Sequence, residues 1–337
     1  MSRATHLLVA NPAAQSGRNA SRIDRALRAF QKHRIPCEFM ATRPDRQTIS
    51  DVRAALLSGQ FQCVVSMGGD GTLREVAQGL LESGLHTRVP LAMLPAGTAN
   101  NHGRSFGLDL SDGALEKNVA IIAHARETLL DVGQLELFPE SGETALQANF
   151  IDSVGFGIGA RVITQRHAER RRFSEKNILS HFYRDLVVYT VATLQSLSSA
   201  QESDEFGVTI VADGQTRTQP QLTELLVKGT RVYAGRWIID RTSKHDDGLF
   251  ELITYIDNSR WVAKGLVDLF KNDKLDSLLD NSPLALPKPL RVARVEIEFQ
   301  AREDHRLPAI QVDGDLFAPA KRAIVDVLPR VLRLIVP

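Results

Sequence analysis

The hydrophobic positions in the first third of the chain alternate between two periods. Short apolar runs of strand length are followed by stretches whose apolar residues recur at helical spacing. The strand-like runs are His6–Ala10, Cys37–Thr42, Cys63–Met67 and Pro90–Leu94, and the helical stretches are Arg22–His33, Ile49–Leu56 and Leu73–Leu81. This alternation predicts a parallel sheet flanked by helices. Ligands of such sheets bind beyond the carboxyl ends of the strands, so the loops after the strands are the expected site.

The pattern changes after about Asp131, where longer strand-like segments appear between turn signals such as Asp213-Gly214. These segments are Ala148–Val154, Val208–Ala212, Glu224–Lys228, Leu249–Asp257 and Val292–Gln300. They predict a mainly antiparallel β domain, into which two helical stretches, at about residues 160–176 and 181–198, are inserted. The apolar end of the chain, Ala323–Val336, is expected to pack back on the body of the protein.

The composition limits the expected number of domains, the partners and the cellular location of the protein. A chain of 337 residues is long enough for two domains. The 41 Lys and Arg balance the 40 Asp and Glu, so no net field attracts nucleic acid or an acidic membrane, and nucleic acid is not an expected partner. We find no signal-peptide pattern and no apolar run near the ~20 residues that span a bilayer. Cys37 and Cys63 lie in apolar stretches and are expected to be buried free thiols. These features favour a cytoplasmic protein.

The sharpest local feature is the run Gly68-Gly69-Asp70-Gly71-Thr72, which follows an apolar strand and opens a helix. Its glycines let the backbone turn tightly and approach a bulky anion. The free N–H groups of the helix N-terminus suit a phosphate, so the site needs no lysine. A plain strand-to-helix turn is the alternative. The Gly-x-Gly-x-x-Gly spacing of dinucleotide-binding folds is absent.

The other predicted strands also end in loops of small or polar residues. They are Leu94-Pro-Ala-Gly-Thr-Ala-Asn100 after the fourth strand, Asn11-Pro-Ala-Ala-Gln-Ser-Gly17 after the first and Ala41-Thr42 at the second. Packing alone does not readily explain such loops at neighbouring strand ends, because βα loops normally vary in composition. We therefore favour a shared phosphate site over a set of unrelated loops.

In this order and spacing, the motifs Asn-Pro…Ser-Gly, Gly-Gly-Asp-Gly-Thr and Leu-Pro-x-Gly-Thr-x-Asn resemble the catalytic domain shared by diacylglycerol kinases, sphingosine kinases and bacterial lipid kinases. The resemblance runs from about residue 5 to residue 320. It implies an N-terminal α/β nucleotide-binding domain, related to phosphofructokinases and NAD kinases, and a C-terminal β-sandwich domain, with ATP in the cleft between them. We expect the first domain to comprise residues 1–133 together with about 321–337, and the lipid-substrate domain to comprise residues 134–320.

The resemblance also implies roles for single residues. Asp313, in Gln311-Val-Asp-Gly-Asp315, would be the catalytic base, with Asp315 and Asp70 as further catalytic carboxylates. The implied nucleotide-binding residues are Asn11, Ser16, Gly17, Thr42, Gly68, Gly69, Asp70, Gly71, Thr72, Leu73, Arg74 and Thr98. A structural Mg²⁺ would be held by the carboxylate of Asp247 and the backbone carbonyls of Lys244 and Leu249. Asp131 matches an acidic position that helps to organise the catalytic metal network with Asp70.

These roles agree with the chemistry of phosphoryl transfer. The reaction needs a cation that neutralises the phosphates and a carboxylate that orients the acceptor hydroxyl, and one or two carboxylates suffice for Mg²⁺. For Asp313-Gly314 and Asp247-Gly248, a simple β-turn is the alternative. Two positions depart from the family pattern: Asn101 stands where an Asp is usual, and Asp315 replaces a Glu. His102, His181 and His245 are interpreted as ordinary histidines.

The remaining predictions concern the substrate. The expected function is ATP-dependent transfer of the γ-phosphoryl group to the hydroxyl of a diacylglycerol-like lipid, by a protein associated peripherally with a membrane. The basic run at residues 161–176 would contact anionic headgroups, or is a solvated helix face. The stretch at residues 182–197 would line an acyl-chain pocket or pack in the core. An NAD kinase and a non-catalytic nucleotide or lipid sensor are the alternative functions. The oligomeric state, including a homodimer, is left open.

Overall fold

The protein is described from a computed structural model. The structure describes residues 5–12, 18–97, 100–140, 144–164, 205–233, 237–238, 242–256, 288–300 and 306–337, together with single positions 142, 278, 282 and 285. The predicted basic run, the stretch at residues 182–197 and His181 lie outside these residues, apart from the start of the run: residues 158–164 are helical.

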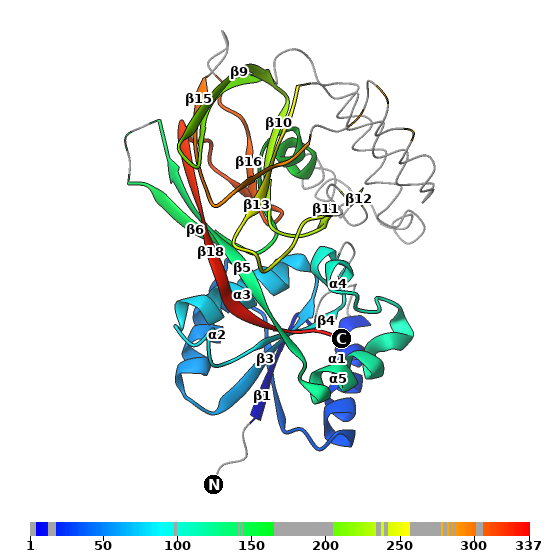
Figure 1. Ribbon diagram of the computed structural model, residues 1–337. Coiled ribbons are helices and arrows are strands. Elements are labelled where there is room, and N and C mark those ends of the chain that lie inside the picture. Colours follow the sequence, from blue (N-terminus) through cyan, green and yellow to red (C-terminus); the bar gives the residue numbers. More distant parts are fainter. Residues whose placement is uncertain are drawn as a thin grey trace, which may run out of the picture.

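The N-terminal half is a parallel sheet covered by helices on both faces, as the alternating pattern predicted (Figure 1). Its strands lie in the order β2-β1-β3-β4 and are all parallel. They are β1 (Thr5–Ala10), β2 (Cys37–Ala41), β3 (Phe61–Gly68) and β4 (Leu91–Pro95). The helices are α1 (Arg18–Lys32), α2 (Gln47–Leu57), α3 (Asp70–Glu82), α4 (Asn101–Ser105) and α5 (Leu115–His124), with a 3-10 turn at Asp112–Ala114.

Alternate residues of each strand in this half point to opposite faces of the sheet, so each face has its own core. In β1, Leu7 and Val9 pack with the apolar side chains of α2 and α3. Leu8 and Ala10 pack on the other face with those of α1 and α5. This arrangement leaves the carboxyl ends of β3 and β4 uncovered by the core helices and free to carry loops.

Two long strands connect the halves. β5 (Glu127–Phe138) and β18 (Arg322–Ile335) pair antiparallel along their length. β18 lies beside β4 at its C-terminal end, where Leu334 pairs with Leu91, and beside β15 (Arg294–Gln300) at its start. Figure 1 shows both strands running from one half into the other. The end of the chain therefore packs back on the body of the protein, and the boundary proposed at residue 133 falls inside β5.

The C-terminal half is a β-sandwich. One layer is the outer part of the large sheet, in the order β18-β15-β8-β9 with β5 and β6 alongside, and the other is a separate sheet, β14-β13-β10-β7-β16-β17. The additional strands are β6 (Leu146–Phe150), β7 (Ser153–Gly157), β8 (Phe206–Ala212), β9 (Gln215–Leu222), β10 (Glu224–Lys228), β11 (Val232–Tyr233), β12 (Trp237–Ile238), β13 (Phe250–Tyr255), β14 (Leu290–Val292), β16 (Ile310–Val312) and β17 (Asp315–Phe317).

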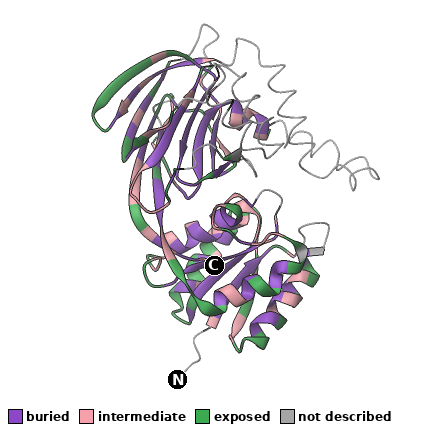
Figure 2. Cartoon of the chain, turned by 45° about the vertical axis from the view of Figure 1, so that its right-hand side comes forward, coloured by how far each residue is buried: buried purple, intermediate pink, exposed green. Residues whose placement is uncertain are grey.

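The core of the sandwich lies between its two layers. Leu135, Phe150 and Ile297 from the large sheet meet Phe156 and Val227 from the smaller one, and all are fully buried. Figure 2 shows buried residues along the strands of this half. The predicted fold class, an α/β domain followed by a β-sandwich, is confirmed.

Three details of the sequence analysis need correction. The predicted strand Ala148–Val154 is two strands, β6 and β7, because the chain breaks at Ile151 and Asp152, whose N–H groups turn towards Asp313. Cys37 is half-buried rather than buried, although both cysteines are free as expected. β5 was not foreseen as a strand, because its residues read as the end of one domain and the start of the next.

Candidate functional site

The loop after β3 has the open backbone that an anion site requires. Helix α3 begins at Asp70, directly after Gly69, and no side chain among the described residues caps it. Its first N–H groups are therefore available to a ligand. A Cβ added to Gly71 would meet nothing within 4 Å in the described part of the chain, so packing does not require this glycine. Its small size leaves the helix N-terminus open to approach.

The loops after β3 and β4 are held against each other by backbone contact. A Cβ on Gly97 would lie 2.3 Å from Cα of Gly69, which only two glycines can accommodate. Asn100 closes the second loop, because its side chain accepts from N–H of Gly97 at 3.0 Å and donates to the carbonyl of Gly97 at 2.9 Å. Ala96 also donates to the carbonyl of Gly68 at 2.8 Å. The glycines thus serve loop-to-loop packing as well as ligand approach.

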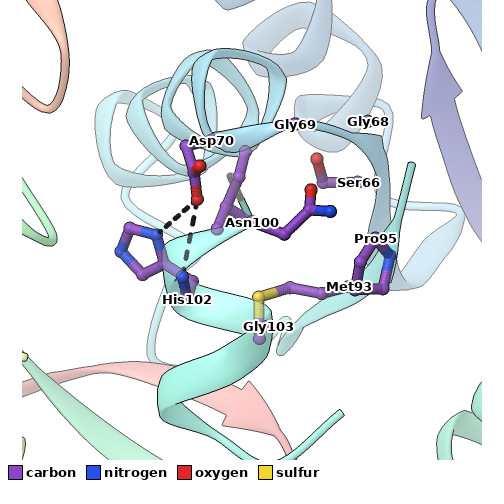
Figure 3. A pocket seen from close by; sticks show the side chains of 10 residues that line it. Ser66, Gly68, Gly69, Asp70, Met93, Pro95, Asn100, His102 and Gly103 are labelled. Atoms are coloured by element: carbon purple, nitrogen blue, oxygen red, sulfur yellow. Dashed lines mark hydrogen bonds and ion pairs between the residues drawn. The ribbon is translucent and has the colours of Figure 1, made fainter. Parts of the chain in front are cut away.

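A small pocket lies between these loops. Ser66, Gly69, Asp70, Asn100 and His102 are among the residues that line it. Figure 3 shows the side chains of Ser66 and Asn100 at this pocket and Asp70 turned towards His102. The pocket joins the end of β3 to the start of α4.

Asp313 is buried at the junction of the halves, 7% exposed, in the turn after β16. Its carboxylate accepts three backbone N–H groups from the break between β6 and β7: Ile151 at 2.9 Å, Asp152 at 2.8 Å and Ser153 at 2.9 Å. Burial and the charge of Asp152 raise the pKa of Asp313, against the effect of His102 and these N–H groups. A carboxylate held rigidly, with a raised pKa, suits a general base.

His102 is not the ordinary histidine that the sequence analysis assumed. It is 2% exposed, and its backbone N–H and its Nδ1 both lie 3.4 Å from Oδ1 of Asp70 (Figure 3). Burial alone would lower the pKa of His102, but the contact with Asp70 and the charges of Asp152 and Asp313 raise it to about 9. At neutral pH, His102 is therefore an imidazolium among three carboxylates that come from both halves.

A second buried cation lies on the other side of Asp152. Lys228 donates to Oδ1 of Asp152 at 2.5 Å, to Oγ1 of Thr230 at 3.0 Å and to the carbonyl of Val232 at 2.8 Å. Although burial opposes it, Lys228 and His102 lower the pKa of Asp152. Asn101, which stands where the family has an Asp, donates to Oδ2 of Asp152 at 3.4 Å. The amide of Asn101 can donate to the carboxylate of Asp152, whereas an aspartate at position 101 would be repelled by it.

Asp315 joins the two halves in a different way. Its carboxylate pairs with the guanidinium of Arg74 in α3 and lies 3.7 Å from that of Arg46, which also stacks over Phe317. Arg74 is buried and Asp315 is partly exposed. The family resemblance expected Asp315 to assist the base and Arg74 to contact phosphates. In the structure Arg74 pairs with Asp315, which also lies near Arg46.

The predicted metal-site residues form a structural turn. Asp131, 1% exposed, accepts N–H of Gly248 and N–H of Arg330, each at 2.7 Å, and its own N–H donates to the carbonyl of His245 at 2.7 Å. Asp247 pairs with Arg291 and accepts N–H of Leu249 at 3.2 Å. Lys244 is exposed. Burial raises the pKa of Asp131.

This donor set does not fit a metal ion as it stands. Both oxygens of the Asp247 carboxylate are occupied, one of them by a cation, and those of Asp131 are used by N–H groups. No cluster of three or more His, Cys, Asp and Glu that could hold a metal occurs in the part of the chain that the structure describes. A metal at Asp247 would require Arg291 to move, and the metal role stays a prediction.

The remaining predicted nucleotide-contact residues are only partly visible. Asn11 is exposed at the end of β1, and its carbonyl accepts from the side chain of Asn19 at 2.7 Å. Thr42 follows β2, and its N–H donates to the carbonyl of Ala10 at 2.9 Å. Leu73 is a core residue of α3. Ser16, Gly17 and Thr98 lie outside the described residues. No helix in the described regions is long and apolar enough to cross a membrane.

A glycine loop at an open helix N-terminus and a buried carboxylate, Asp313, in the second half agree with what phosphoryl transfer requires, a phosphate site and a base. Residues 5–135 match the family model of the diacylglycerol kinase catalytic domain. The resemblance predicted from the motifs is thereby confirmed for this part of the chain, and the relatives, a diacylglycerol kinase and a probable lipid kinase, support a kinase enzyme.

Comparisons with individual proteins agree with this assignment. A diacylglycerol kinase of Mycobacterium tuberculosis is 25% identical over 291 residues, which cover 84% of this chain and 80% of that protein. A probable lipid kinase, YegS-like, of Klebsiella pneumoniae is 32% identical over 104 residues, 31% of this chain and 30% of that protein.

Solved structures show that the fold is shared over the whole chain. A diacylglycerol kinase from Bacillus anthracis superposes with a TM-score of 0.67 at 16% identity, covering 99% of this chain and 97% of that one. An NAD kinase from Archaeoglobus fulgidus gives a TM-score of 0.50 at 11% identity, covering 98% and 93%. At these identities the likeness establishes the fold alone.

Proposed function

We propose that the protein is an ATP-dependent lipid kinase that transfers the γ-phosphoryl group to a hydroxyl of a diacylglycerol-like lipid at a membrane surface. The observation that supports it most is the position of Asp313, a buried carboxylate with a raised pKa. Its charge raises the pKa of His102, and His102 contacts Asp70 at the loop from Gly68 to Thr72. The proposed base and the proposed phosphate loop therefore interact electrostatically through His102.

In this proposal the nucleotide phosphates rest on the loop from Gly68 to Thr72. The first N–H groups of α3 and the positive end of its dipole bind the phosphate oxygens. Gly71 leaves room for them, and the contact between Gly69 and Gly97 keeps the loops after β3 and β4 in register. Asn11, Ser16, Gly17, Thr42 and Thr98, which lie at or after the ends of the predicted strands in the sequence, would complete the nucleotide site.

The lipid hydroxyl is placed at Asp313. The carboxylate accepts the hydroxyl proton as the oxygen attacks the γ-phosphorus, and the N–H groups of residues 151–153 hold the carboxylate in place. His102 supplies a positive charge beside Asp70 and offsets the charge of the neighbouring carboxylates. Mg²⁺ enters with ATP as part of the substrate, and no step is assigned to the turn at Asp247.

The test is phosphorylation of a lipid panel with γ-labelled ATP, comparing the unmodified protein with Asp313→Asn. We expect a labelled diacylglycerol-type product from the unmodified protein. The Asn variant should lose most turnover because its amide cannot accept the proton, and it should keep its affinity for ATP because Asp313 lies outside the loop from Gly68 to Thr72. Full turnover by Asp313→Asn would refute the role of Asp313. Labelled NADP in place of labelled lipid would refute the lipid acceptor.

A further inference from the structure

A second polar site lies inside the C-terminal half, on the face of the smaller sheet that is turned away from the sandwich core. Glu224 of β10 and Gln311 of β16 are 0% and 1% exposed, and both lie over the glycines of β7. A Cβ on Gly155 would be 2.8 Å from Nε2 of Gln311 and 3.1 Å from Oε1 of Glu224. Within the described regions neither atom has a hydrogen-bond partner.

Polar atoms that are buried without a hydrogen-bond partner destabilise the fold, because they lose their bonds to water and gain none in return. The orientation of Gln311 is determined by its other end, because Oε1 accepts N–H of Gly314 at 2.8 Å. Nε2 must therefore point over Gly155. Glu224 is held in the same way, since Oε2 accepts N–H of Gly159 at 2.9 Å and leaves Oε1 directed over the same glycine.

The protonation of Glu224 determines what this pair can bind. Burial raises the pKa of Glu224 to about 8, against the N–H groups of Gly159 and Ile158. At neutral pH the acid is therefore mostly neutral. Because Oε2 accepts N–H groups, the proton belongs on Oε1, where it is a donor. Two donors, an O–H and an N–H, then converge above Gly155.

Of the three glycines near Glu224, only Gly157 is required by its backbone conformation. Gly157 has a φ of +118°, and a Cβ there would lie 2.3 Å from the carbonyl of Thr223, so its backbone explains it. Gly155 and Gly159 have no positive φ, and an added Cβ would approach only side-chain atoms, those of Gln311, Glu224 and Tyr233. An alanine at either position would therefore crowd Oε1 of Glu224, and at Gly155 also Nε2 of Gln311.

This site is next to the proposed base. Gln311 precedes Asp313 by two residues, a separation of roughly 7 Å along a strand, and its amide is bonded to Gly314 in the same turn. From these contacts we infer that Glu224 and Gln311 form an acceptor subsite that binds uncharged oxygen atoms, such as the ester or hydroxyl oxygens of a glycerol-type headgroup, while the reacting hydroxyl lies at Asp313. The inference rests on the proposed lipid kinase function.

Two other headgroup chemistries fit the Glu224 and Gln311 pair less well. A phosphate-bearing headgroup would need a cation, and Lys228, the nearest cation along β10, is occupied by Asp152, Thr230 and Val232. An ammonium group, as in a sphingoid base, would bring a donor to a site that already presents two donors. A neutral ester or hydroxyl oxygen accepts from both.

The experiment compares acceptor and nucleotide kinetics in matched glycine variants. Gly155→Ala places a methyl group between the two donors, and Gly159→Ala approaches Oε1 of Glu224 from the other side, at 2.8 Å. Gly207→Ala is the control, because its Cβ would meet the end of another glutamine, Gln300, at 2.9 Å, on the opposite sheet. KM is measured for dihexanoylglycerol and for ATP, with the melting temperature of each variant.

We expect Gly155→Ala and Gly159→Ala to raise the KM for dihexanoylglycerol by about 10–200-fold, the range for one methylene group in a binding pocket. Their KM for ATP should be unchanged, and Gly207→Ala should match the unmodified protein in both. Glu224→Gln should retain activity on dihexanoylglycerol, because its amide is still a donor. If a glycine variant does not fold, the activity of Glu224→Gln on dihexanoylglycerol still tests the subsite.

Each contrary result has a distinct meaning. If the unmodified protein phosphorylates lipids and both glycine variants keep its KM for dihexanoylglycerol, the subsite is refuted while the proposed function stands. The neutral chemistry is refuted if sphingosine is the better acceptor and Glu224→Gln abolishes its phosphorylation. If no lipid is phosphorylated by the unmodified protein, the proposed function itself fails.

Discussion

Replacing Gly97 by Ala tests the contact on which the geometry of the phosphate loops depends. The added Cβ would lie 2.3 Å from Cα of Gly69, 3.0 Å from its N and 2.9 Å from Oδ1 of Asn100. Carbon atoms in contact prefer about 3.5–4.0 Å, so the two loops must part by about 1 Å. Neither near atom of Gly69 can move out of the way as the end of a flexible side chain would.

Two consequences of this displacement can be measured. Overpacking of this kind costs about 1–3 kcal/mol of the free energy of unfolding, which chemical denaturation would detect. A displacement of about 1 Å between groups that position a reacting phosphate costs about 100-fold in rate. We therefore expect Gly97→Ala to be less stable and to lose both ATP affinity, measured by calorimetry, and turnover.

Gly71→Ala is the matched control, because a Cβ there meets nothing within 4 Å among the described residues. Alanine in the first turn of α3 should leave stability unchanged or raise it by up to about 1 kcal/mol, while its methyl group narrows the approach to the helix N-terminus. ATP affinity should fall without a loss of stability. Wild-type stability of Gly97→Ala would refute the loop contact, and wild-type ATP affinity of Gly71→Ala would refute phosphate binding at this helix.

Two further predictions concern the buried charges. Lys228→Met leaves the Asp152 carboxylate buried without its cation and should lower the free energy of unfolding by about 3–5 kcal/mol. The loss should be smaller in the double variant that also carries Asp152→Asn. An equal loss in the single and the double variant would contradict the pairing of Lys228 with Asp152. The pKa of His102 is raised from 6.5 to about 9, so its contribution to stability is complete below pH 6.5 and is lost as pH rises through 9. His102→Gln should flatten this slope in denaturation curves from pH 6 to 10, and an unchanged slope would contradict the charge assignment.

The sequence was sufficient to predict the elements that depend on local patterns. Strand β10 occurs at its predicted bounds, Glu224–Lys228, because its central residues, Leu225–Val227, are apolar and the segment is flanked by turns. The loop from Gly68 to Thr72 was recognisable because its glycines and helix start are adjacent in sequence. The same holds for Asp313-Gly314, although sequence alone left a plain turn open.

Contacts between distant residues could not be predicted in this way. His102 shows no metal-ligand spacing, and its importance comes from Asp70, 32 residues earlier, and from the buried acids of the other half. Asp152 was hidden inside a predicted strand, because the break that turns its N–H towards Asp313 is imposed by a partner 161 residues away. Asn101, noted as a lost carboxylate, makes sense only once Asp152 is seen beside it.

The balance of charges at the junction supports Asp313 as the base on grounds independent of the motif. Two of the three carboxylates there are paired with a cation. The buried Asp152 pairs with Lys228, and the partly exposed Asp70 pairs with His102. Asp313 accepts only neutral backbone N–H groups in its described contacts. Among the described residues, Asp313 has no cation in direct contact, although the charge of His102 acts on it, so of the three carboxylates it gains most from binding a proton. The arrangement therefore makes Asp313, rather than Asp70 or Asp152, the group best suited to take a proton from an incoming hydroxyl.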